Sequence, residues 1–401
     1  MLKRRLFSHF QTILAQQPAN RLLAIDVFRG LTITAMILVN NPGSWQHIYR
    51  PMRHAQWHGW TLTDLIFPFF IFIVGISIQL SGQRLLAAGV TAKIILKQAL
   101  IRSIKLLLLG WFLALFYYNF TAESYDWIEQ RLMNIRFMGV LQRIAVVYII
   151  CVVLWLFLSK RALIFSFVGI LLLYWLGLSS IPYQDSLGNH YQGLLDFGNN
   201  LSAWLDARIF SPTHLYYSTA TPFPFDPEGI LSTLPAVATG ISGMLVGHLL
   251  TTPSLTELKK HYALLAFGLG GVILGELWHL YFPINKALWT SSYVLLSSGY
   301  ACLLLVCLNV ALKRKSLQLC SAPFVVFGAN SIAFFMFAGV LGRILIIWPV
   351  GDTSLKGWLY TQIFSPWFGN LNGSLMFALC FLAVSYLCMH WMYKKRIFWK
   401  V

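Results

Sequence analysis

Ten long apolar runs divide this sequence, and they constrain its fold more than any other feature. A helix that crosses a bilayer takes about 20 mostly apolar residues, and each run is close to that length. The runs lie near residues 22–41, 61–81, 103–120, 137–158, 162–181, 229–250, 262–282, 290–312, 322–347 and 372–393. With 11% charged residues, a chain of 401 residues has too few charges to cover a soluble surface. We therefore predict an all-α polytopic membrane protein with about ten transmembrane helices.

The segments between the apolar runs alternate in charge. Lys and Arg gather in the N-terminal tail and in residues 82–102, 159–161, 251–261, 313–315 and 394–400. Most of the carboxylates lie in the other segments, which are 42–60, 121–136, 182–228, 283–289 and 348–371. Short basic loops stay in the cytoplasm, so both termini are predicted to be cytoplasmic. The net charge of +17 then reflects topology, and we expect no nucleic-acid partner because no basic groove with stacking aromatics lies outside the runs.

Three parts are predicted along the chain. A basic cytoplasmic segment, 1–21, precedes a single transmembrane domain, 22–393, and a basic cytoplasmic tail, 394–401, follows it. The first part forms either a helix on the membrane surface or a frayed tail, because several apolar residues share one helical face. These residues are Leu2, Leu6, Phe10, Ile13 and Leu14. The long outer loop 182–228 contains Trp204 and four tyrosines, and this aromatic content predicts an ordered segment over the outer mouth.

Two polar sites in the first run are candidates for function, since ionisable residues inside spans are expensive. Asp26 and Arg29 are three residues apart and face each other on a helix. They form either a structural ion pair or a site where Arg29 meets a phosphate-bearing ligand from the cytoplasm. Asn40 and Asn41 end the run, where an amide is either bonded to water or aimed as a donor at a carbonyl.

The first outer segment is the richest in candidate catalytic groups. His54 and Asp64 lie within eleven residues of each other, and a histidine whose tautomer a carboxylate sets can accept a proton near neutral pH. Asp64 also fits a capping box with Thr61 at the start of the second run. His54 and His58 have the spacing of metal ligands but no evident third ligand, so we predict no metal. The six cysteines include no Cys-x-x-Cys pair, so no disulfide framework or zinc site is expected.

Other polar residues lie at the outer ends of later runs. They are Gln142 and Arg143 in the fourth run, Asp226 and Glu228 at the start of the sixth, and Asn285, Lys286 and Trp289 ahead of the eighth. Carboxylates at a helix N-terminus complement its dipole, so Asp226 and Glu228 have helix capping as their simplest interpretation. A pore or a proton relay also uses residues of this kind. Gly243 with Gly247, and Gly271 with Gly275, predict close helix packing.

Several motifs, taken in order, resemble the heparan-α-glucosaminide N-acetyltransferase family. They are RLLAIDVFRG (21–30), VN (39–40), HAQWHGWTLTDLIFPFF (54–70), IRFMGVLQR (135–143), DPEGIL (226–231), PINKALW (283–289), GANSI (328–332) and KRIFWK (395–400). The resemblance covers nearly the whole membrane region. The lysosomal enzyme of this family has an extra lumenal N-terminal region and one more span, for which this sequence has no counterpart. Loop 182–228 has no clear match in the family, so the acceptor is the part of the implied function that the resemblance defines least.

The resemblance implies an active-site histidine at His54, an acetyl-contacting amide at Asn40 and a supporting carboxylate at Asp64. We expect acetyl-CoA as co-substrate, with contacts from Arg29, Asp26, Asn40 and Arg143. We expect the acceptor to meet residues of the outer segments. These are Trp57, Asp226, Glu228, Asn285, Lys286 and Trp289.

The function predicted on this basis is acetyl transfer across a membrane. An acetyl group would pass from cytoplasmic acetyl-CoA to the amine of glucosamine or a glucosamine-ended saccharide on the outer side. The bacterial branch of the family places such a protein in the cytoplasmic (inner) membrane, with the lipid bilayer as partner and a homodimer as an open alternative. A secondary transporter of amino sugars is the rival hypothesis, although the sequence has no evident inverted repeat. A structural or sensor protein is the third.

Overall fold

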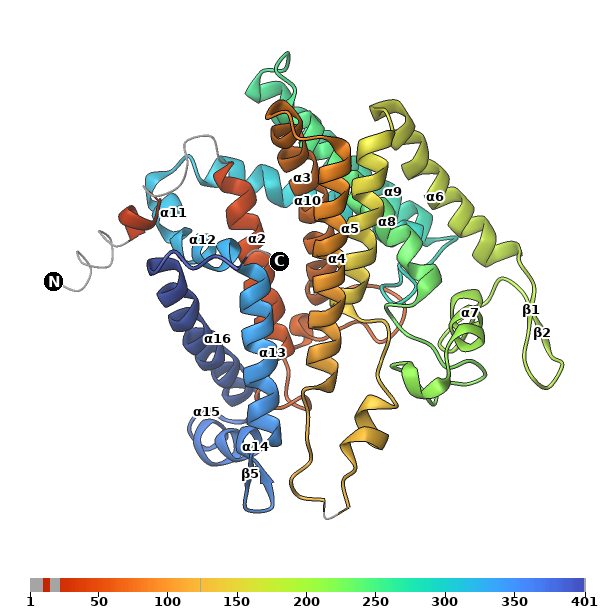
Figure 1. Cartoon of the computed structure of the whole chain (residues 1–401), viewed down its shortest axis with the longest axis vertical. Coiled ribbons are helices and arrows are strands. Elements are labelled where there is room, and N and C mark those ends of the chain that lie inside the picture. The colour runs from red at the N-terminus through yellow and green to blue at the C-terminus, as the bar shows by residue number, and fades with distance from the viewer. Residues whose placement is uncertain (1–9, 15–21, 123, 400–401) are drawn as a thin grey trace.

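The computed structural model describes residues 10–14, 22–122 and 124–399, and it is a bundle of long helices with three short hairpins (Figure 1). The long helices are α2 (Leu23–Asn40), α3 (Ile66–Ala87), α4 (Ala92–Leu115), α5 (Val140–Phe157), α6 (Lys160–Ser180), α8 (Ile230–Thr251), α9 (Glu257–His279), α10 (Ser291–Ala311), α13 (Ser331–Ile347) and α16 (Asn370–Lys394). The shorter helices are α7 (Leu201–Ile209), α11 (Lys315–Cys320), α12 (Ala322–Ala329), α14 (Leu355–Leu359) and α15 (Ser365–Phe368). Single turns lie at Arg50–Met52, Leu62–Leu65, Ile128–Leu132, Pro212–His214 and Tyr360–Phe364.

The number of predicted spans is confirmed. In the described part of the chain, nine helices are long and apolar enough to cross a membrane, and the pair α12–α13, bent by 84°, brings the number to ten. One boundary was wrong, because the third span begins at Ala92 rather than near residue 103. Lys93, Lys97 and Arg102 lie in this extra stretch, where the helix continues past its apolar part; Lys93 and Lys97 are exposed, and Arg102 is half-buried.

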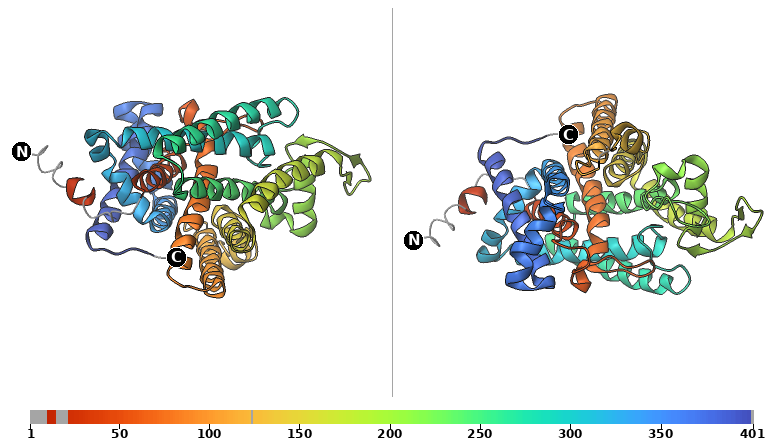
Figure 2. Two further views of the ribbon diagram at one scale, coloured as in Figure 1. Left: turned by 90° about the horizontal axis from the view of Figure 1, so that it is seen from above. Right: turned by 90° about the horizontal axis from the view of Figure 1, so that it is seen from below.

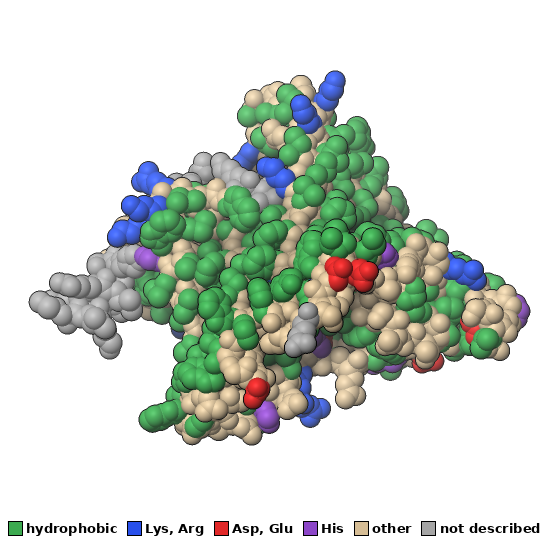
Figure 3. All heavy atoms as spheres, turned by 60° about the horizontal axis from the view of Figure 1, so that its bottom comes forward, with side chains coloured by type: hydrophobic (Ala, Val, Ile, Leu, Met, Phe, Trp, Pro, Cys, Tyr) green, Lys and Arg blue, Asp and Glu red, His purple; other side chains and the backbone are tan. Residues whose placement is uncertain are grey.

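The helix ends divide the molecule into two faces. The turns α3–α4, α5–α6, α8–α9 and α10–α11 lie at one end, here called the basic end. The segments 41–61, 116–139, 181–229, 280–290 and 348–369 lie at the other, here called the loop end (Figure 1). In Figure 3 Lys and Arg gather at the upper rim, and the Asp and Glu side chains in view lie away from that rim. Hydrophobic side chains cover the surface between them. This is the charge pattern of a membrane protein whose basic loops share one side.

Helices α3 and α8 pack together in the middle of the bundle (Figure 2). Their backbones come close because glycines face each other. A Cβ on Gly75 would lie 2.0 Å from the Gly240 carbonyl oxygen, and one on Gly243 would lie 2.0 Å from that of Phe72. The glycine pair Gly271 and Gly275 likewise meets α10 at contact distance. The predicted close packing at these small residues is therefore confirmed.

The outer loop is ordered, as its composition predicted. Strands β1 (Tyr183–Gln184) and β2 (His190–Tyr191) form one hairpin, and β3 (Leu195–Asp196) and β4 (Asn199–Asn200) form another, ahead of α7. A third hairpin, β5 (Pro349–Val350) with β6 (Thr353–Ser354), precedes α14. Buried aromatic and aliphatic residues, among them Tyr183, Phe223 and Phe225, pack the loop onto the ends of α6 and α9.

The N-terminal prediction is described only in part. Residues 10–14 are helical, and Ile13 is buried among apolar residues of α2, α12, α13 and α16. The carbonyl of Ile13 also accepts a hydrogen bond from the Tyr393 hydroxyl at 3.3 Å. Leu2 and Leu6, the other part of the predicted apolar face, lie outside the described residues.

Candidate active site

His54 and Asp64 are directly hydrogen-bonded at the loop end. The capping box predicted from Thr61 and Asp64 is present, and it turns the chain from the 53–61 segment into α3. This turn places the Asp64 carboxylate under the His54 ring, with Nδ1 of His54 2.6 Å from Oδ1 of Asp64. The second carboxylate oxygen accepts from the backbone N–H groups of Ala55 at 2.9 Å and Thr61 at 3.0 Å. Asp64 is thereby held in one orientation.

These contacts determine which nitrogen of His54 is the basic one. An ionised carboxylate can only accept, so Nδ1 of His54 carries the hydrogen and Nε2 has the free lone pair. The Asp64 side chain is 1% exposed and that of His54 is 49% exposed, so the imidazole stands open above a buried anion. A histidine held in this way is suited to remove a proton at Nε2.

Lys286 completes this group from a distant part of the chain. Its Nζ lies 3.4 Å from Oδ1 of Asp64 and 3.1 Å from Nδ1 of His54. Since Nδ1 already donates to Asp64, the favourable contact of Lys286 is the ion pair with the carboxylate. Burial lowers the pKa of Lys286, and the negative charges of Asp64 and Glu228 oppose that effect. Lys286 therefore pairs with Asp64 and is also within the electrostatic influence of Glu228, a carboxylate of a different motif.

Hydrogen bonds and burial hold the segment 283–290, and these contacts position Lys286. The Asn285 side chain is buried and accepts from the Leu288 backbone N–H at 2.9 Å, while the Asn285 N–H donates to the Thr290 hydroxyl at 3.0 Å. Trp289 is fully buried, and its indole N–H donates to Thr239 at 3.0 Å. Asn285 and Trp289, predicted as acceptor-binding residues, thus contact protein groups and support the loop that carries Lys286.

A buried ionic cluster lies behind Lys286. Arg136 donates two hydrogen bonds to Asp226, each 2.6 Å long, and a further one to Glu228. Arg143 is fully buried in α5, bonds to Ser232, and lies with its guanidinium carbon 5.1 Å from the centre of the Trp289 ring. Arginine suits such a site because its planar group can serve two acceptors at once. Arg143 therefore belongs to the cluster at the loop end.

The capping role considered for Asp226 and Glu228 is not what the structure shows. Asp206 of α7 is the carboxylate at the N-terminus of α8, accepting from the N–H groups of Ile230 at 3.1 Å and Asp226 at 3.3 Å. Asp226 and Glu228 instead pair with Arg136. Burial raises the pKa of Asp206 to about 6, against the effect of these two hydrogen bonds. This role of Asp206 could not be predicted from the sequence, because Asp206 lies 24 residues before Ile230, the first residue of α8.

Trp57 belongs to the packing of the outer loop. Its indole N–H donates to the Leu195 carbonyl at 2.8 Å, and its ring meets Phe197 and Phe225 edge-on at 5.2 and 5.7 Å. His58, next to it, is exposed and lies 3.5 Å from the Asn285 amide. In the described chain no carboxylate is hydrogen-bonded or ion-paired to His58, and of these two histidines His54 is the one that combines an open ring with a buried anion.

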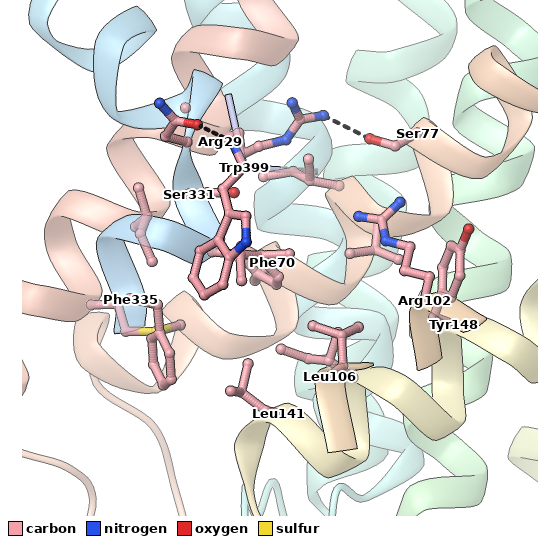
Figure 4. A pocket seen from close by; sticks show the side chains of 18 of the residues that line it. Arg29, Phe70, Ser77, Arg102, Leu106, Leu141, Tyr148, Ser331, Phe335 and Trp399 are labelled. Carbon is pink, nitrogen blue, oxygen red and sulfur yellow. Dashed lines mark hydrogen bonds between the residues drawn. The ribbon is translucent and has the colours of Figure 1, made fainter. Parts of the chain in front are cut away.

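A cavity of about 430 Å³ lies among α2, α3, α4 and α5 (Figure 4). Arg29 and Arg102 line it together with Ser77, Tyr148 and Trp399. Arg29 donates to the Ser77 hydroxyl at 2.7 Å and lies 3.5 Å from Asp26, so the predicted ion pair is present and Arg29 still reaches the cavity. Arg102 stacks over Tyr148, while its buried Nε has no hydrogen-bond partner among the described residues. The cavity therefore offers cationic donors to an anionic ligand.

The position of Trp399 was not predicted from the tail's composition. The tail folds back, with the Trp399 N–H bonded to the Asn330 side chain at 3.0 Å and the Asn330 amide bonded to the Ile397 carbonyl at 2.9 Å. Asn330 lies at the break between α12 and α13, so the tail fills that break and brings Trp399 into the wall of the cavity.

Asn40 lies apart from His54 in the described contacts. It lines another cavity at the loop end with Asn41 and three cationic residues. The two cavities follow one face of α2, since Arg29, Ile33 and Met36 line the first and Ile37 and Asn40 line the second. Residues at this spacing form a single helical stripe, so a ligand extending along α2 would pass from Arg29 toward Asn40.

Comparison with known proteins gives these motifs a family. A family model described as heparan-alpha-glucosaminide N-acetyltransferase, catalytic, matches residues 21–272. The chain belongs to this family. The match includes His54, Asp64 and the ionic cluster of Arg136 and Arg143, and it ends before Lys286. The family resemblance drawn from the sequence motifs is thus confirmed.

Two relatives extend the family match along the chain. The mouse heparan-alpha-glucosaminide N-acetyltransferase is 28% identical over 99% of this chain and 63% of its own length. The human protein of the same name is 28% identical over 95% of this chain and 60% of its own length. The chain therefore spans about three-fifths of the length of the curated relatives it matches.

Proposed function

We propose that this membrane protein transfers an acetyl group from acetyl-CoA to the amine of glucosamine or of a glucosamine-ended saccharide. The observation that carries the proposal is the His54–Asp64 pair, held at 2.6 Å at the loop end of a bundle whose family is that of an N-acetyltransferase. The names of the mouse and human relatives supply the acceptor class. We place the basic end in the cytoplasm, because basic loops favour that side, and the protein in a bacterial inner membrane.

The cavity lined by Arg29 and Arg102 fits the donor. Acetyl-CoA carries phosphates at one end and a thioester at the other, and Arg29 and Arg102 place two guanidinium groups where phosphates would enter. The lining then becomes apolar toward Phe70 and Leu141, which suits the neutral arm of the molecule. Phe70 follows Asp64 by six residues, or about 9 Å along a helix axis, so the cavity extends toward the catalytic group.

The chemistry requires one base and one donor to the developing oxyanion. The acceptor nitrogen attacks the thioester carbonyl, a C–N bond forms and the C–S bond breaks, and the nitrogen proton passes to Nε2 of His54. The imidazolium formed is stabilised by Asp64, and it can return the proton to the leaving sulfur. Asn40 is the proposed donor to the oxyanion, supported by its place on the same stripe of α2 that begins at Arg29. Lys286, which pairs with Asp64, and Glu228, which pairs with Arg136, are the charged groups proposed for the acceptor side.

A secondary transporter is the rival, and one observation favours it. The 84° break between α12 and α13 is a feature that transporters use to bind ions. Here, however, the Asn330 side chain at the break bonds to Ile397 and Trp399 of the tail. The break thus has partners from the chain itself, and the transferase remains the better-supported function.

A vesicle assay tests both the activity and its direction. The protein is inserted with its basic end outward, acetyl-CoA is added outside, and glucosamine is enclosed inside. We expect free thiol to appear outside and N-acetylglucosamine inside, at a rate that depends on the enclosed amine. Vesicles containing N-acetylglucosamine in place of glucosamine are the control. Uptake or release of the sugar without thiol formation would identify a transporter instead.

The donor cavity leads to a prediction on CoA binding. Arg102→Gln removes a guanidinium whose Nε has no partner in the part of the chain that the structure describes. We expect CoA affinity to fall about tenfold, which corresponds to the loss of one charge-assisted hydrogen bond. Raising the salt concentration should likewise weaken the binding of CoA to the wild-type protein. Calorimetry on the purified protein measures both effects. Lys97→Gln, an exposed change on the same helix outside the cavity, is the matched control, and equal losses in both variants would remove Arg102 from the site.

A further inference from the structure

The cavity that contains Asn40 has an unusual charge. It has a volume of about 440 Å³ and lies between α2, α4, α13 and α14. Arg131, Arg343 and Lys356 line it, and among the described residues its lining includes no Asp or Glu. A concentration of three cations in a partly buried site is unfavourable without an anion.

None of these three cations has an ion-pair partner within residues 10–14, 22–122 and 124–399. Arg343 donates to the Gly339 carbonyl of its own helix at 3.0 Å. Arg131 donates to the Tyr125 hydroxyl at 3.2 Å and stacks over Tyr117, and Lys356 lies 5.8 Å from the centre of the Trp45 ring. These neutral contacts leave donors available, and guanidinium and ammonium groups together favour an oxyanion.

An apolar groove adjoins the cationic cavity. Its volume is about 860 Å³, and its lining is almost entirely hydrophobic. Tyr117 lines both spaces. On α13, Arg343 and Ile346 face the cavity while Ile344 and Ile347 face the groove, so the two spaces lie on neighbouring stripes of one helix.

Both spaces lie where the spans end. Helix α2 ends at Asn40, α4 at Leu115 and α13 at Ile347, and Trp45, Trp127 and Trp348 surround these ends. Figure 1 shows α14 next to the end of α13 at the same level. Tryptophan at the ends of spans is typical of the headgroup region of a bilayer. A ligand here would meet cations on one side and hydrocarbon contacts on the other.

We propose that this cavity and groove bind a lipid phosphate, with its phosphate ester between Arg343, Lys356 and Arg131 and its hydrocarbon chain in the groove. The site does not include the His54–Asp64 pair, and its phosphate-binding residues have no role in the proposed acetyl transfer, although Asn40, the proposed oxyanion donor, also lines this cavity. The phosphate has two possible sources, which are a phospholipid of the bilayer and a lipid phosphate that carries the amino-sugar acceptor.

Binding of dodecyl phosphate to the purified full-length chain in neutral detergent tests the proposal. We expect Arg343→Gln/Lys356→Gln to lower the affinity roughly tenfold or more. Arg50→Gln/Arg208→Gln, two exposed changes at the same end with the same change in charge, should leave it unaltered. Inorganic phosphate should bind at least tenfold more weakly than dodecyl phosphate, because it lacks the chain. Equal affinity in the two double variants, or equal affinity for the two ligands, would overturn the proposal.

Two further measurements concern the folding of the double variant and the source of the lipid phosphate. If the double variant does not fold, Lys356→Gln alone, in which α13 is unaltered, serves for the same comparison and must reduce the affinity. Turnover of methyl glucosaminide and of glucosamine linked to a lipid phosphate then distinguishes the sources. If the variant loses turnover only with the lipid-linked acceptor, the bound lipid phosphate is the acceptor. If the variant retains less phosphatidylglycerol and both rates change to the same extent, the bound lipid is a phospholipid of the bilayer. Unaltered retention together with unaltered rates would again refute the site.

Discussion

Replacing His54 with alanine should reduce turnover by about 10²–10⁴-fold, because a positioned general base contributes that much to the rate. The binding of CoA should persist, since the cavity lined by Arg29 and Arg102 does not include His54. The fold should also persist, because the His54 side chain is 49% exposed and contributes little packing. Thiol release at saturating acetyl-CoA, with CoA affinity measured in parallel, separates these effects.

His58→Ala is the matched control for this experiment. It removes a second exposed histidine from the same segment, four residues away, whose hydrogen-bond partner among the described residues is the Asn285 amide at 3.5 Å. We expect this variant to keep most of its turnover. If both variants were equally active, His54 would be a loop residue without a catalytic role, and the proton would have to leave by another path.

Asp64→Asn should cause a loss of similar size for a different reason. An asparagine amide can donate to Nδ1 of His54, which would place the imidazole hydrogen on Nε2 and remove the free lone pair that faces the acceptor. The ion pair with Lys286, 3.4 Å long in the wild-type protein, would also be lost. We expect turnover to fall by about 10²–10⁴-fold, as for loss of the base itself.

The effects of Asp64 and His54 should not add. Because both act through one imidazole, the double variant His54→Ala/Asp64→Asn should be no slower than His54→Ala alone. Asp196→Asn, which neutralises an exposed acid near His58, is the control and should leave turnover close to that of the wild-type protein. Additive losses in the double variant would show that Asp64 acts independently of His54, as a structural residue of the capping box.

Local features of this protein could be predicted from the sequence because they depend on neighbours in the chain. A run of about 20 apolar residues must form a helix in lipid whatever surrounds it, since its backbone groups have no other partners there. The capping box of Thr61 and Asp64 depends on residues three apart, and the His54–Asp64 contact joins residues ten apart on either side of that turn. Each of these was predicted without knowledge of the helix arrangement.

The tertiary structure alone decided which distant groups meet. Lys286 reaches Asp64 across 222 positions of the sequence, Arg136 pairs with Asp226 across 90, and Asp206 bonds to the N-terminus of α8 that Asp226 was expected to cap. The separate placement of Asn40, the return of Trp399 to the donor cavity and the cationic cavity of Arg343 are of the same kind. Such contacts depend on how helices pack through their glycine faces, and hydropathy records only that a helix is apolar, not which of its sides faces which neighbour.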